Sequence, residues 1–369
     1  MPDSRFDVVI IGAGIAGASV AWFLAQTHRV LILERESQPG YHATGRSGAI
    51  YVASYGNATV QALNRATWPF LSSPPTGFAE VPLVGPQCGV LTIDAHGDHD
   101  ASTVDEPSSH RRLSALEAKA MVPILREDRL SGAWFDPDAS AIDVDALLQG
   151  FLRGAKRSGA VLATDREVRA LCRERTEWRV TTNADDYFAP ILVNAAGAWA
   201  STIANLAGAS AIPLNPLKRT ALIVDAPAGT NIAGWPLVLD ARETFYFKPD
   251  AGRLLISPAD ETPSLPTDAY PDELAIALAI DRVQAIADLP VRRVVRSWAG
   301  LRTFAPDRTP VVGFDPVAQG FFWLAGQGGY GLQTSAAMGL LAASLIRKEP
   351  LPEALALVRE NALAPERFA

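Results

Sequence analysis

Cysteine and histidine are scarce in this sequence. Among 369 residues there are two cysteines, Cys88 and Cys172, which lie far apart and form no CxxC pair. This argues against a disulfide framework and a cysteine zinc site, and it fits a reducing compartment such as the cytoplasm. The five histidines form no HExxH motif. His96 and His99 in "DAHGDHD" resemble a chelator, but we interpret them as a solvated polar loop, because metal sites need matched supporting groups. No metal is expected.

Basic residues are outnumbered by acidic ones. The chain has 33 Lys and Arg against 40 Asp and Glu, which gives a formal net charge of -7. Nucleic-acid-binding proteins are usually basic, so no nucleic-acid partner is expected. With 48% hydrophobic and 20% charged residues, the composition is typical of a soluble globular protein. The length exceeds that of a typical single core and predicts two domains.

Long hydrophobic runs are also few, and the one at Val8–Gln26 is nearly long enough to span a bilayer. The preceding "MPDSRFD" has no cationic region and no small-residue cleavage site follows, which excludes a signal peptide. The run also changes period, because "DVVIIG" is typical of a strand and "IAGASVAWFLAQT" of a helix. We therefore expect a strand and a helix, a cytoplasmic location, and at most peripheral membrane association.

A GxGxxG turn joins this strand to this helix, and a second β-rich run, "RVLILE", ends in an acid. The first glycine permits a tight turn, the second lets a pyrophosphate approach the backbone, and the third lets the helix pack on the strand. The pyrophosphate would lie at the helix N-terminus, and the acid would accept hydrogen bonds from a ribose diol. This predicts a dinucleotide site at Gly12, Gly14, Ile15, Ala16, Gly17, Glu34 and Arg35. Arg35 could suggest NADP, but Glu34 would repel a 2′-phosphate.

A second glycine-rich loop, "GYHATGRSG" at residues 40–48, follows soon after the ribose acid. An NAD domain usually continues straight to its next βα unit. An FAD must be held at a second point as it extends toward its flavin, and a Gly/Ser/Arg loop with free N–H groups suits that task. FAD is therefore favoured, with Thr44, Gly45, Arg46 and Ser47 as further cofactor-binding residues.

Segments along nearly the whole chain carry a more specific resemblance. They are "VVIIGAGIAGASVA", "LERESQPGYHATGRSG", "WFDPDASAIDVDALLQGF", "ILVNAAGAWA", "FYFKPDAG", "WAGLRTFAPDRTPVVG" and "GFFWLAGQGGYGLQTSAAMG". The chain resembles the D-amino-acid oxidase superfamily of FAD enzymes, in the branch with glycine oxidase, sarcosine oxidase and small bacterial D-amino-acid dehydrogenases. The D-arginine dehydrogenase type looks closest, which implies non-covalent FAD. Some amine dehydrogenases tether FAD through a histidine in such a loop, which would be His42 here.

The expected fold class is α/β, with a Rossmann-like FAD-binding domain interleaved with an antiparallel-sheet α+β substrate domain. The FAD domain would comprise residues 1–55, 140–208 and 299–369, and the substrate domain residues 56–139 and 209–298. The runs "RTALIVDA", "TFYFKPD" and "GRLLISP" alternate as in an antiparallel sheet with one covered face.

Helix caps can be expected from the same sequence. Ser114 and Glu117 form a capping box before "LEAKAMV", and either Asp143 or Asp145 would cap the helix in "VDALLQGFLRGAKRSG".

The segment "GQGGYGLQTSAAMG" indicates the flavin end of the cofactor. Its glycines let backbone approach a flat ring, and a helix expected to start near Leu332 would direct its positive end at the pyrimidine side. A packing turn before a C-terminal helix is the alternative. The further cofactor-binding residues expected here and in the other matching segments are Val168, Ala196, Gly197, Trp199, Gly300, Arg302, Gln327, Gly328, Gly329, Tyr330, Gly331, Leu332 and Gln333.

The candidate substrate residues are Tyr55, Arg219, Tyr246, Arg302 and Tyr330. Arg302 lies in the apolar segment "WAGLRTF", where a buried guanidinium needs an anion, and a substrate carboxylate would supply one. A surface ion pair is the alternative for each arginine, and Lys218 competes with its neighbour Arg219. The resemblance implies carboxylate binding in the "KR", "FYFKPD" and "GLRTF" segments. It also implies a mobile segment carrying Tyr55.

The expected reaction is FAD-dependent oxidation of a D-amino acid to an imino acid, which water hydrolyses to a 2-oxo acid and ammonia. Configuration is implied by the resemblance alone. Oxygen, a quinone and a carrier protein all remain open as electron acceptors. The alternatives are oxidation of a secondary or N-methyl amine or of a 2-hydroxy acid, and a non-catalytic flavin-binding redox module.

The side-chain pocket is expected at Ile50, Val52, Gly89 and Leu237. In the resembling enzymes that prefer cationic substrates, an acid aligns with Gly89, and none stands here. We therefore expect uncharged D-amino acids to be preferred, and Gly89→Glu to raise activity on D-Arg. The alternative is that another acid, such as Glu80 or Glu243, reaches the site.

Overall fold

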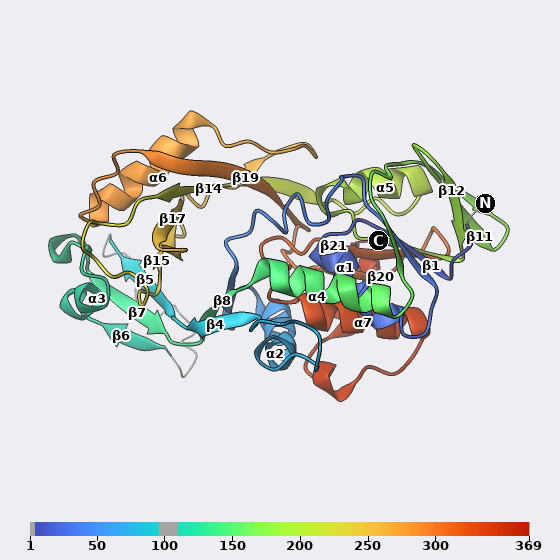
Figure 1. Cartoon of the computed structure of the whole chain (residues 1–369), viewed down its shortest axis with the longest axis horizontal. Coiled ribbons are helices and arrows are strands. Elements are labelled where there is room, and N and C mark those ends of the chain that lie inside the picture. The colour runs from blue at the N-terminus through green and yellow to red at the C-terminus, as the bar shows by residue number, and fades with distance from the viewer. Residues whose placement is uncertain (1–3, 96–109, 369) are drawn as a thin grey trace.

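A six-stranded sheet contains the predicted N-terminal unit. In the computed structural model, which describes residues 4–95 and 110–368, this sheet lies toward the end of the molecule where the N-terminus is marked (Figure 1). Its strand order is β20 (Val311–Phe314), β21 (Phe321–Ala325), β13 (Ile191–Asn194), β1 (Val8–Ile11), β2 (Val30–Leu33) and β9 (Val161–Ala163). From β21 to β9 the strands pair in parallel, and β20 pairs antiparallel to β21. The predicted strand, glycine turn, helix and strand are confirmed.

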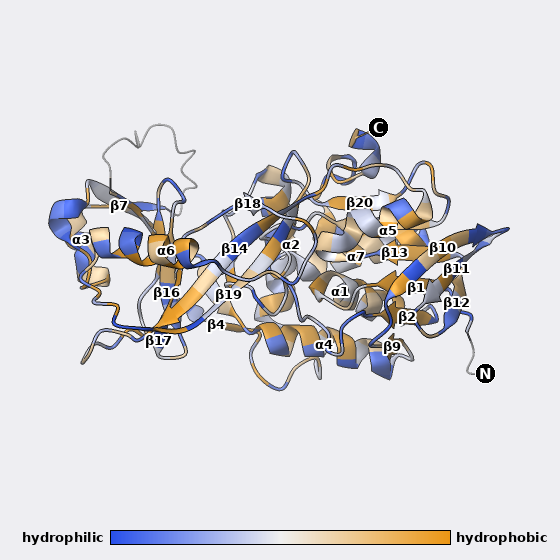
Figure 2. Cartoon of the chain, turned by 90° about the horizontal axis from the view of Figure 1, so that it is seen from above, coloured by the Kyte–Doolittle hydropathy of each residue, from blue (hydrophilic) through white to orange (hydrophobic). Residues whose placement is uncertain are grey.

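Helices cover both faces of this sheet. The segments α1 (Ile15–Leu24), α2 (Ala58–Ser72), α4 (Val144–Arg157) and α7 (Ser335–Arg347) share one hydrophobic core. Packed against the opposite face are α5 (Ala200–Ala207) and a small sheet of β10 (Val168–Glu174), β11 (Glu177–Thr182) and β12 (Asp186–Ala189). Every residue of β1 and β2 is buried, as parallel strands covered on both faces should be. Figure 2 shows hydrophobic colouring at the centre of this sheet.

A nine-stranded sheet forms the other half of the molecule. Its order is β18 (Thr262–Pro263), β14 (Asn215–Val224), β17 (Arg253–Ser257), β16 (Tyr246–Asp250), β15 (Leu237–Asp240), β5 (Val90–Asp94), β7 (Gly132–Asp136) and β6 (Arg111–Leu113), with β19 (Val294–Phe304) paired to β14. Most neighbours are antiparallel, as expected for the substrate region, but β15 and β5 pair in parallel. The long strands β14 and β19 extend toward the six-stranded sheet (Figure 1).

Alternation along these strands gives the sheet two different faces. Leu91, Val238 and Phe247 point into a core shared with α3 (Ala115–Met121) and α6 (Glu273–Ile286). Their neighbours Val90 and Leu237 point the other way, toward the cavity described below. The sequence pattern therefore places apolar side chains on the substrate side of this sheet as well as in its core.

The remaining elements are short. A three-stranded sheet of β3 (Ile50–Val52), β8 (Ala139–Ile142) and β4 (Val84–Gln87) has its central strand directly before α4. Five 3-10 helices complete the described chain, at Glu127–Arg129, Gly197–Trp199, Glu353–Leu355, Glu360–Ala362 and Pro365–Phe368. Within residues 4–95 and 110–368, no helix has the length and hydrophobicity needed to cross a membrane.

The predicted helix caps are present. Ser114 and Glu117 form the reciprocal capping box of α3. The side chain of Asp143, rather than that of Asp145, caps α4 by accepting a hydrogen bond of 2.8 Å from the backbone N–H of Ala146. His96 and His99 lie outside the described residues.

The two regions are interleaved in the chain, and two elements do not follow the expected domain boundaries. The helix α2, which falls in the segment 56–139 assigned to the substrate domain, packs against α7 in the core of the six-stranded sheet. The strand β19 runs across the boundary expected between residues 298 and 299. A strand shared in this way carries residues from one region directly into the cavity of the other.

Candidate active site

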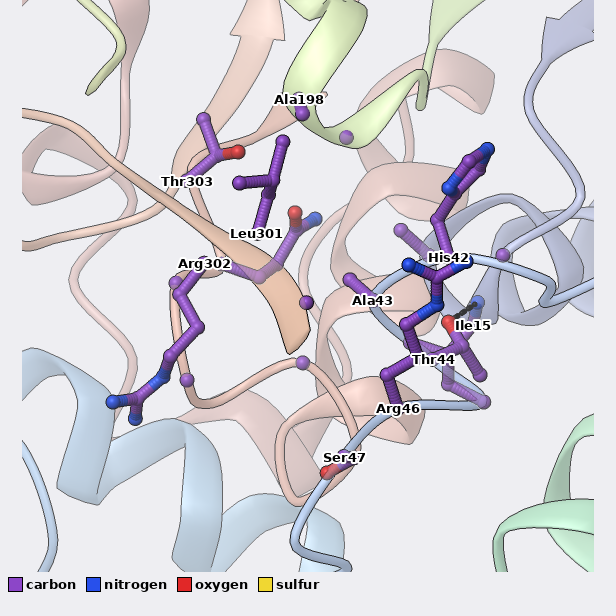
Figure 3. Close-up of a pocket in the computed structure, with 18 of the residues that line it drawn as sticks. Ile15, His42, Ala43, Thr44, Arg46, Ser47, Ala198, Leu301, Arg302 and Thr303 are labelled. Atoms are coloured by element: carbon purple, nitrogen blue, oxygen red, sulfur yellow. Dashed lines mark hydrogen bonds between the residues drawn. The ribbon is translucent and has the colours of Figure 1, made fainter. Parts of the chain in front are cut away.

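A cavity of about 380 Å³ is lined by residues from both large sheets, and Figure 3 shows part of its wall. Nearly all of the predicted site residues line it. They are Gly12, Gly14, Ile15, Ala16, Glu34, Arg35, Thr44, Arg46, Ser47, Ile50, Val52, Tyr55, Val168, Ala196, Gly197, Trp199, Arg219, Leu237, Tyr246, Gly300, Arg302, Gln327, Gly328, Gly329, Gly331, Leu332 and Gln333. Gly17, Gly45, Gly89 and Tyr330 were expected to line it and do not.

The first glycine turn is closed by contacts within the protein. Gly12 has a φ of +104°, and a Cβ atom there would lie 2.5 Å from the carbonyl oxygen of Ala195 at the end of β13. A Cβ atom on Gly17 would lie 1.9 Å from the carbonyl oxygen of Gly12. Gly17 therefore lets the helix pack on the turn, as predicted, without contacting a ligand directly.

The second glycine-rich loop folds onto the start of α1. The backbone N–H of Ile15 donates a hydrogen bond of 3.0 Å to the Thr44 hydroxyl, drawn as a dashed line in Figure 3. A Cβ atom on Gly14 would lie 3.2 Å from that same hydroxyl oxygen. The loop and the helix N-terminus thus form one wall, with the backbone amides and the positive end of the helix dipole beside the cavity. Gly45 closes the loop itself through a hydrogen bond to the Gly40 carbonyl oxygen.

Glu34 directly follows β2, at the end of the predicted run, and the residue is 8% exposed. One oxygen accepts a hydrogen bond of 2.8 Å from Ala13 N, and the other accepts one of 3.0 Å from Glu36 N. Each carboxylate oxygen has a second lone pair, so the acid can also accept hydrogen bonds from ribose hydroxyls. The Arg35 guanidinium lies 4.8 Å from the ring centroid of Trp199, so the cavity wall already provides it with a partner.

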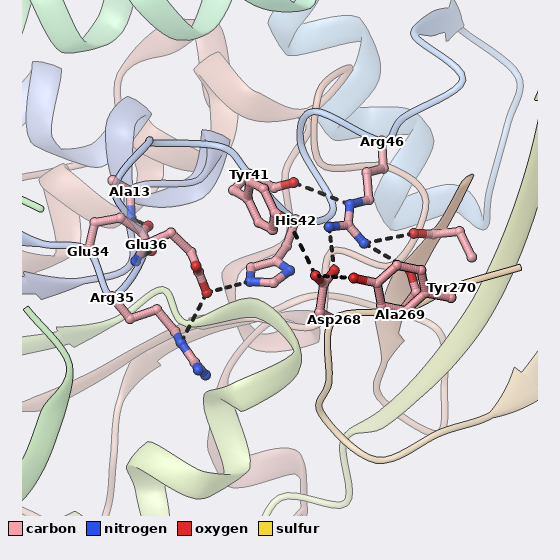
Figure 4. Close-up of polar contacts among 11 residues, drawn as sticks. Ala13, Glu34, Arg35, Glu36, Tyr41, His42, Arg46, Asp268, Ala269 and Tyr270 are labelled. Carbon is pink, nitrogen blue, oxygen red and sulfur yellow. Dashed lines mark hydrogen bonds and ion pairs between the residues drawn. The ribbon is translucent and has the colours of Figure 1, made fainter. Parts of the chain in front are cut away.

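Figure 4 shows the polar contacts beside this acid. Nε2 of His42 lies 2.9 Å from a carboxylate oxygen of Glu36, and the His42 ring packs 4.6 Å from that of Trp199. His42 lines the cavity while its Nε2 atom is engaged by this carboxylate.

Arg46 joins the cofactor loop to the nine-stranded sheet. Its Nη1 atom donates hydrogen bonds of 3.0 Å to the carbonyl oxygens of Ala269 and Ala299, and its Nη2 atom donates to Asp268 (Figure 4). The indole N–H of Trp298 donates to the Arg46 carbonyl oxygen at 3.0 Å. The sequence predicted a cofactor-binding role, and the structure adds that Arg46 holds one cavity wall against the other.

The flavin end carries hydrogen-bond donors that lack partners among the described residues. The Thr303 hydroxyl and the Nε2 atom of Gln333 are buried, have no hydrogen bond, and belong to residues that line the cavity. The other amide atom of Gln333, Oε1, accepts a hydrogen bond of 3.0 Å from Val52 N and fixes the side chain. Buried donors without partners are rare in folded proteins and indicate a polar ligand at this end.

The last glycine loop differs in detail from the expectation. The helix α7 begins at Ser335, three residues later than the predicted start near Leu332, because residues 328–334 form consecutive turns. A Cβ atom on Gly329 would lie 1.6 Å from Nη2 of Arg302, and one on Gly328 would lie 2.0 Å from the ring of Phe304. These glycines therefore also make room for side chains of β19.

Arg302 lies at the expected substrate end of the cavity, away from the loop that carries Thr44 and Arg46 (Figure 3). Its Nη2 atom donates a hydrogen bond of 2.9 Å to the Tyr55 hydroxyl. Its Nη1 atom is buried without a hydrogen-bond partner among the described residues, and the nearest carboxylate oxygen, on Glu261, lies 3.9 Å away. Burial lowers the pKa of Arg302, but the neighbouring Tyr55 and Tyr246 more than offset this, so the pKa is raised overall. The guanidinium is charged and has an open donor.

Arg219 lies beside Arg302 but is already engaged. Its Nε atom donates to the Asp260 carbonyl oxygen at 2.9 Å, and its Nη2 atom donates to Glu261 at 3.0 Å. Burial and the neighbouring Arg302 lower the pKa of Arg219. The competing candidate Lys218 pairs with Asp272 at 2.6 Å and does not line the cavity.

The tyrosines divide into two groups. Tyr55 and Tyr246 line the cavity. Tyr330 is 4% exposed, and its ring packs edge to face against those of Tyr55 and Phe304 at 5.2 and 5.8 Å. Tyr330 thus lies behind Tyr55 and lines a second, outer chamber with Arg308 and Glu261. Tyr330 therefore packs against Tyr55 instead of lining the main cavity.

The Tyr55 segment is hydrogen-bonded to α2, and the mobility that the resemblance implied for it stays a prediction. Nδ2 of Asn64 donates to the carbonyl oxygens of Val52, Ala53 and Tyr55 at 3.3, 3.4 and 3.0 Å. Nε2 of Gln61 donates to the carbonyl oxygens of Ser54 and Gly56, both at 3.0 Å. Sequence reasoning missed these two α2 amides, because helical spacing alone does not show which loop a side chain will contact.

The predicted side-chain pocket is largely present. Ile50, Val52 and Leu237 form an apolar wall with Val90 and Leu239. Gly89 does not take part. Its φ is +73°, and a Cβ atom there would lie 2.4 Å from the Phe135 ring, so the alignment with a substrate-facing acid was wrong. A glutamate at Gly89 would force the backbone or Phe135 to move. Glu243 does line the cavity, and Glu80 does not.

Comparisons with known proteins decide the family. The family model described as FAD dependent oxidoreductase matches residues 7–345. The chain belongs to this FAD-dependent oxidoreductase family. It is 25% identical to glycine oxidase of Geobacillus kaustophilus over 94% of both chains, and the crystal structure of that enzyme superposes with a TM-score of 0.82 over 94% of this chain and 96% of that one.

Two further relatives are informative. Iminodiacetate oxidase from Chelativorans sp. BNC1 has a TM-score of 0.77 at 25% identity, covering 93% of this chain and 96% of that one. Mouse mitochondrial sarcosine dehydrogenase is 25% identical over 62% of this chain and 26% of its own length. The superfamily and branch expected from the sequence are confirmed. The particular closeness to D-arginine dehydrogenases stays a prediction.

The residues on the cavity fit the FAD of this family. Gly14, Ile15 and Thr44 would hold its pyrophosphate, Glu34 its ribose, and the free donors of Thr303 and Gln333 its flavin. Several further cavity residues were missed by sequence reasoning, namely Tyr41, Arg166, Glu167, Thr202, Ile203, Thr267 and Ala269. Tyr41 lies in the second glycine-rich loop, but its side chain was not singled out there. The others lie outside the glycine motifs, on segments brought together by the fold, so no local signal marked them.

Proposed function

We propose that this FAD-dependent oxidoreductase oxidises a small amino acid with an uncharged side chain, of D configuration where the carbon is chiral, to an imino acid. Water then hydrolyses the imino acid to a 2-oxo acid and ammonia. The observation that carries the proposal is the buried guanidinium of Arg302, a cavity residue whose Nη1 atom has no hydrogen-bond partner among the described residues. When bound, FAD supplies the acceptor for the hydride that leaves Cα.

Arg302 would bind the substrate carboxylate through Nη1, in a charge-assisted hydrogen bond. The Tyr55 hydroxyl, which accepts from Nη2 of Arg302, keeps its own proton to donate to the same carboxylate. Holding the carboxylate at these groups fixes the direction of the Cα–H bond, and such positioning supplies a large part of the catalysis. The apolar wall of Ile50, Val52 and Leu237 excludes water and accommodates an uncharged side chain.

The substrate amine must lose a proton before or during the reaction. Of the acids and histidines on the described part of the cavity wall, Glu34, Glu167 and His42 belong to the nucleotide region, and Glu243 is an exposed side chain near the apolar wall. None of them hydrogen-bonds to Arg302 or Tyr55. We therefore assign the proton to solvent, through a water held by Tyr55 or Tyr246.

A second candidate function is oxidation of a secondary amine at the same site. It is favoured by the similarity to sarcosine dehydrogenase and iminodiacetate oxidase, whereas the similarity to glycine oxidase favours a small primary amino acid. Both candidates place a carboxylate at Arg302, so this arginine does not distinguish them.

Anaerobic mixing of the yellow protein with a substrate panel separates the candidates. The panel contains glycine, neutral D-amino acids and their L enantiomers, sarcosine, iminodiacetate and 2-hydroxy acids. Rapid bleaching of the flavin by glycine or neutral D-amino acids supports the proposal. Bleaching by N-substituted amines alone supports the second candidate, and an absence of bleaching by every amine rejects both.

A further inference from the structure

Glu261 lies in the loop between β17 and β18, and its carboxylate accepts hydrogen bonds from two arginines. Its Oε1 atom accepts hydrogen bonds from Nη2 of Arg219 at 3.0 Å and from Nη2 of Arg308 at 2.6 Å. Its Oε2 atom accepts a second hydrogen bond from Arg308, through Nη1, at 3.0 Å. Glu261 lines the outer chamber, and Arg219 lines the main cavity, so the carboxylate lies where the two spaces meet.

A third guanidinium, that of Arg302, completes the cluster, with Nη1 at 3.9 Å from Oε1 of Glu261. The side chains of Arg219 and Arg302 are each 16% exposed, whereas that of Arg308 is 45% exposed and lies 4.1 Å from the Phe304 ring centroid. Solvent screens the charge of Arg308 far better than the charges of the two buried arginines. The charge balance that a ligand meets is therefore set by Arg219, Arg302 and Glu261.

Other acids near the cluster are separated from it. Asp260 directs its two carboxylate oxygens at the Thr220 backbone N–H and hydroxyl, at 2.6 and 3.0 Å, and does not line the cavity. The exposed Glu243 lines the cavity without an ion pair to either arginine. Glu261 is thus the carboxylate that contacts both buried arginines.

The one carboxylate, which Arg219 shares with the more exposed Arg308, leaves Arg302 as the buried cation without a hydrogen-bonded anion. One substrate carboxylate balances it. A second carboxylate on the substrate would lose its hydration without gaining a free cation, because Arg219 is already paired, and an uncompensated buried charge is strongly unfavourable. The contacts of Glu261 thus select against a second anionic group.

We propose that Glu261 is the residue that determines charge selectivity at the substrate site. By neutralising Arg219 it leaves Arg302 for a single carboxylate, and it excludes dicarboxylates such as acidic amino acids and N-carboxymethyl amino acids. The inference rests on the proposed function, in which an amino-acid carboxylate binds Arg302. Glu261 acts through the arginines and does not contact the substrate.

The test uses the FAD-bound full-length protein and the near-isosteric variant Glu261→Gln. The control is Asp225→Asn, because Asp225 also accepts hydrogen bonds from two arginines, Arg253 and Arg293, both at 3.2 Å, and does not line the cavity. Butyrate and succinate have the same number of carbon atoms and one or two carboxylates. Their dissociation constants are measured from the change in flavin absorbance. In Glu261→Gln the dissociation constant of succinate should fall at least tenfold relative to that of butyrate. In Asp225→Asn the ratio of the two constants should stay at the native value.

Turnover gives a second readout with D-Gln and D-Glu, which have nearly the same shape. Glu261→Gln should raise kcat/KM for D-Glu relative to D-Gln at least tenfold over the native ratio. If the native protein oxidises no amino acid, the proposed function fails, but the carboxylate titration still decides the role of Glu261. Ratios within twofold of the native values overturn the proposal. A Glu261→Gln protein that loses its fold or its flavin also overturns it, because Glu261 would then serve the structure.

Discussion

The hydroxyl of Tyr55 lies 2.9 Å from Nη2 of Arg302, although the two residues are 247 positions apart in the chain. The loop that carries Tyr55 follows β3, and Arg302 lies on β19, so this hydrogen bond joins the small sheet to the nine-stranded one. It leaves the other terminal nitrogen of Arg302 without a hydrogen bond. The geometry holds a charged group still while keeping one donor open for a ligand.

Tyr55→Phe should raise KM for the amino acid about 10- to 100-fold with a smaller change in kcat. The variant removes one hydrogen bond to a charged group, and such bonds contribute about 1.5–3 kcal/mol. Steady-state kinetics measure the effect. Tyr187→Phe is the matched control, because Tyr187 bonds Asp185 at an exposed site away from the cavity. Equal kinetics of Tyr55→Phe and native protein would contradict the assigned role.

Arg302→Ala should lower kcat/KM by a factor that corresponds to about 2–5 kcal/mol of lost transition-state stabilisation, because it removes a charged contact from a desolvated site. Arg302→Lys should recover little of the loss. An ammonium lacks the planar guanidinium group, which can donate to Tyr55 and to a carboxylate at the same time. The melting temperature should change less than the activity does. Near-native turnover of the best substrate by Arg302→Ala would show that this arginine is a structural ion pair.

The flavin should leave the protein on denaturation by acid or heat. His42 is the candidate for a covalent link, and its Nε2 atom lies 2.9 Å from the Glu36 carboxylate. Absorbance of the supernatant after precipitation measures the released FAD, and His42→Ala should bind and release FAD as the native protein does. Flavin absorbance that stays with the precipitated native protein and is lost in His42→Ala would reveal a tether.

D-Leu should have a higher kcat/KM than D-Arg. A guanidinium placed against Val52, Val90 and Leu237 would lose hydration, whereas an apolar side chain gains about 25 cal/mol per Å² buried. Glu243 is the acid that could reverse this order, since it lines the same cavity. A clear preference for D-Arg that disappears in Glu243→Gln would assign the cationic site to Glu243.

Asp315 makes stability depend on pH. Its carboxylate is 6% exposed and accepts hydrogen bonds of 2.7–2.9 Å from the N–H groups of Ser210, Val317, Ala318 and the Trp323 indole. Burial raises its pKa, but the donors prevail and hold it below the usual range. The stabilisation is therefore present above the pKa of an unfolded aspartate and is lost as pH falls through the lower folded pKa.

Asp315→Asn should accordingly destabilise the protein by about 2–4 kcal/mol at pH 7, because all four donors lose a charged acceptor and two of them face the amide NH2 group, which cannot accept. Unfolding by urea at pH 7 and near pH 3 measures the loss. The difference between variant and native protein should shrink at the lower pH. A difference that is the same at both values would show that the charge of Asp315 does not stabilise the fold.

Local signals predicted the nucleotide half of the fold well. The change from strand period to helix period at Gly12 and the caps at Ser114 and Asp143 depend on neighbours within a few residues, and Glu34 follows at a motif spacing within the same βαβ unit. Such features are determined by backbone geometry and short-range hydrogen bonds, which a sequence displays directly.

Long-range contacts account for what the sequence did not show. Arg46 lies in the second glycine-rich loop, yet its hydrogen-bond partners Asp268 and Ala269 are more than 200 positions away in the chain. The alignment of Gly89 with an acid failed because the ring of Phe135, on the neighbouring strand, fills the space a side chain would need. Glu261 lies in no motif, and only the fold brings it to Arg219 and Arg302.

The most direct test of the whole account is a crystal structure of the FAD-bound protein with a carboxylate ligand, such as a slowly oxidised amino acid. The account predicts that a carboxylate oxygen lies about 3 Å from Nη1 of Arg302, with the Tyr55 hydroxyl in contact and Arg219 still paired to Glu261. A carboxylate bound instead at Arg308 in the outer chamber, with Nη1 of Arg302 still without a partner, would contradict it.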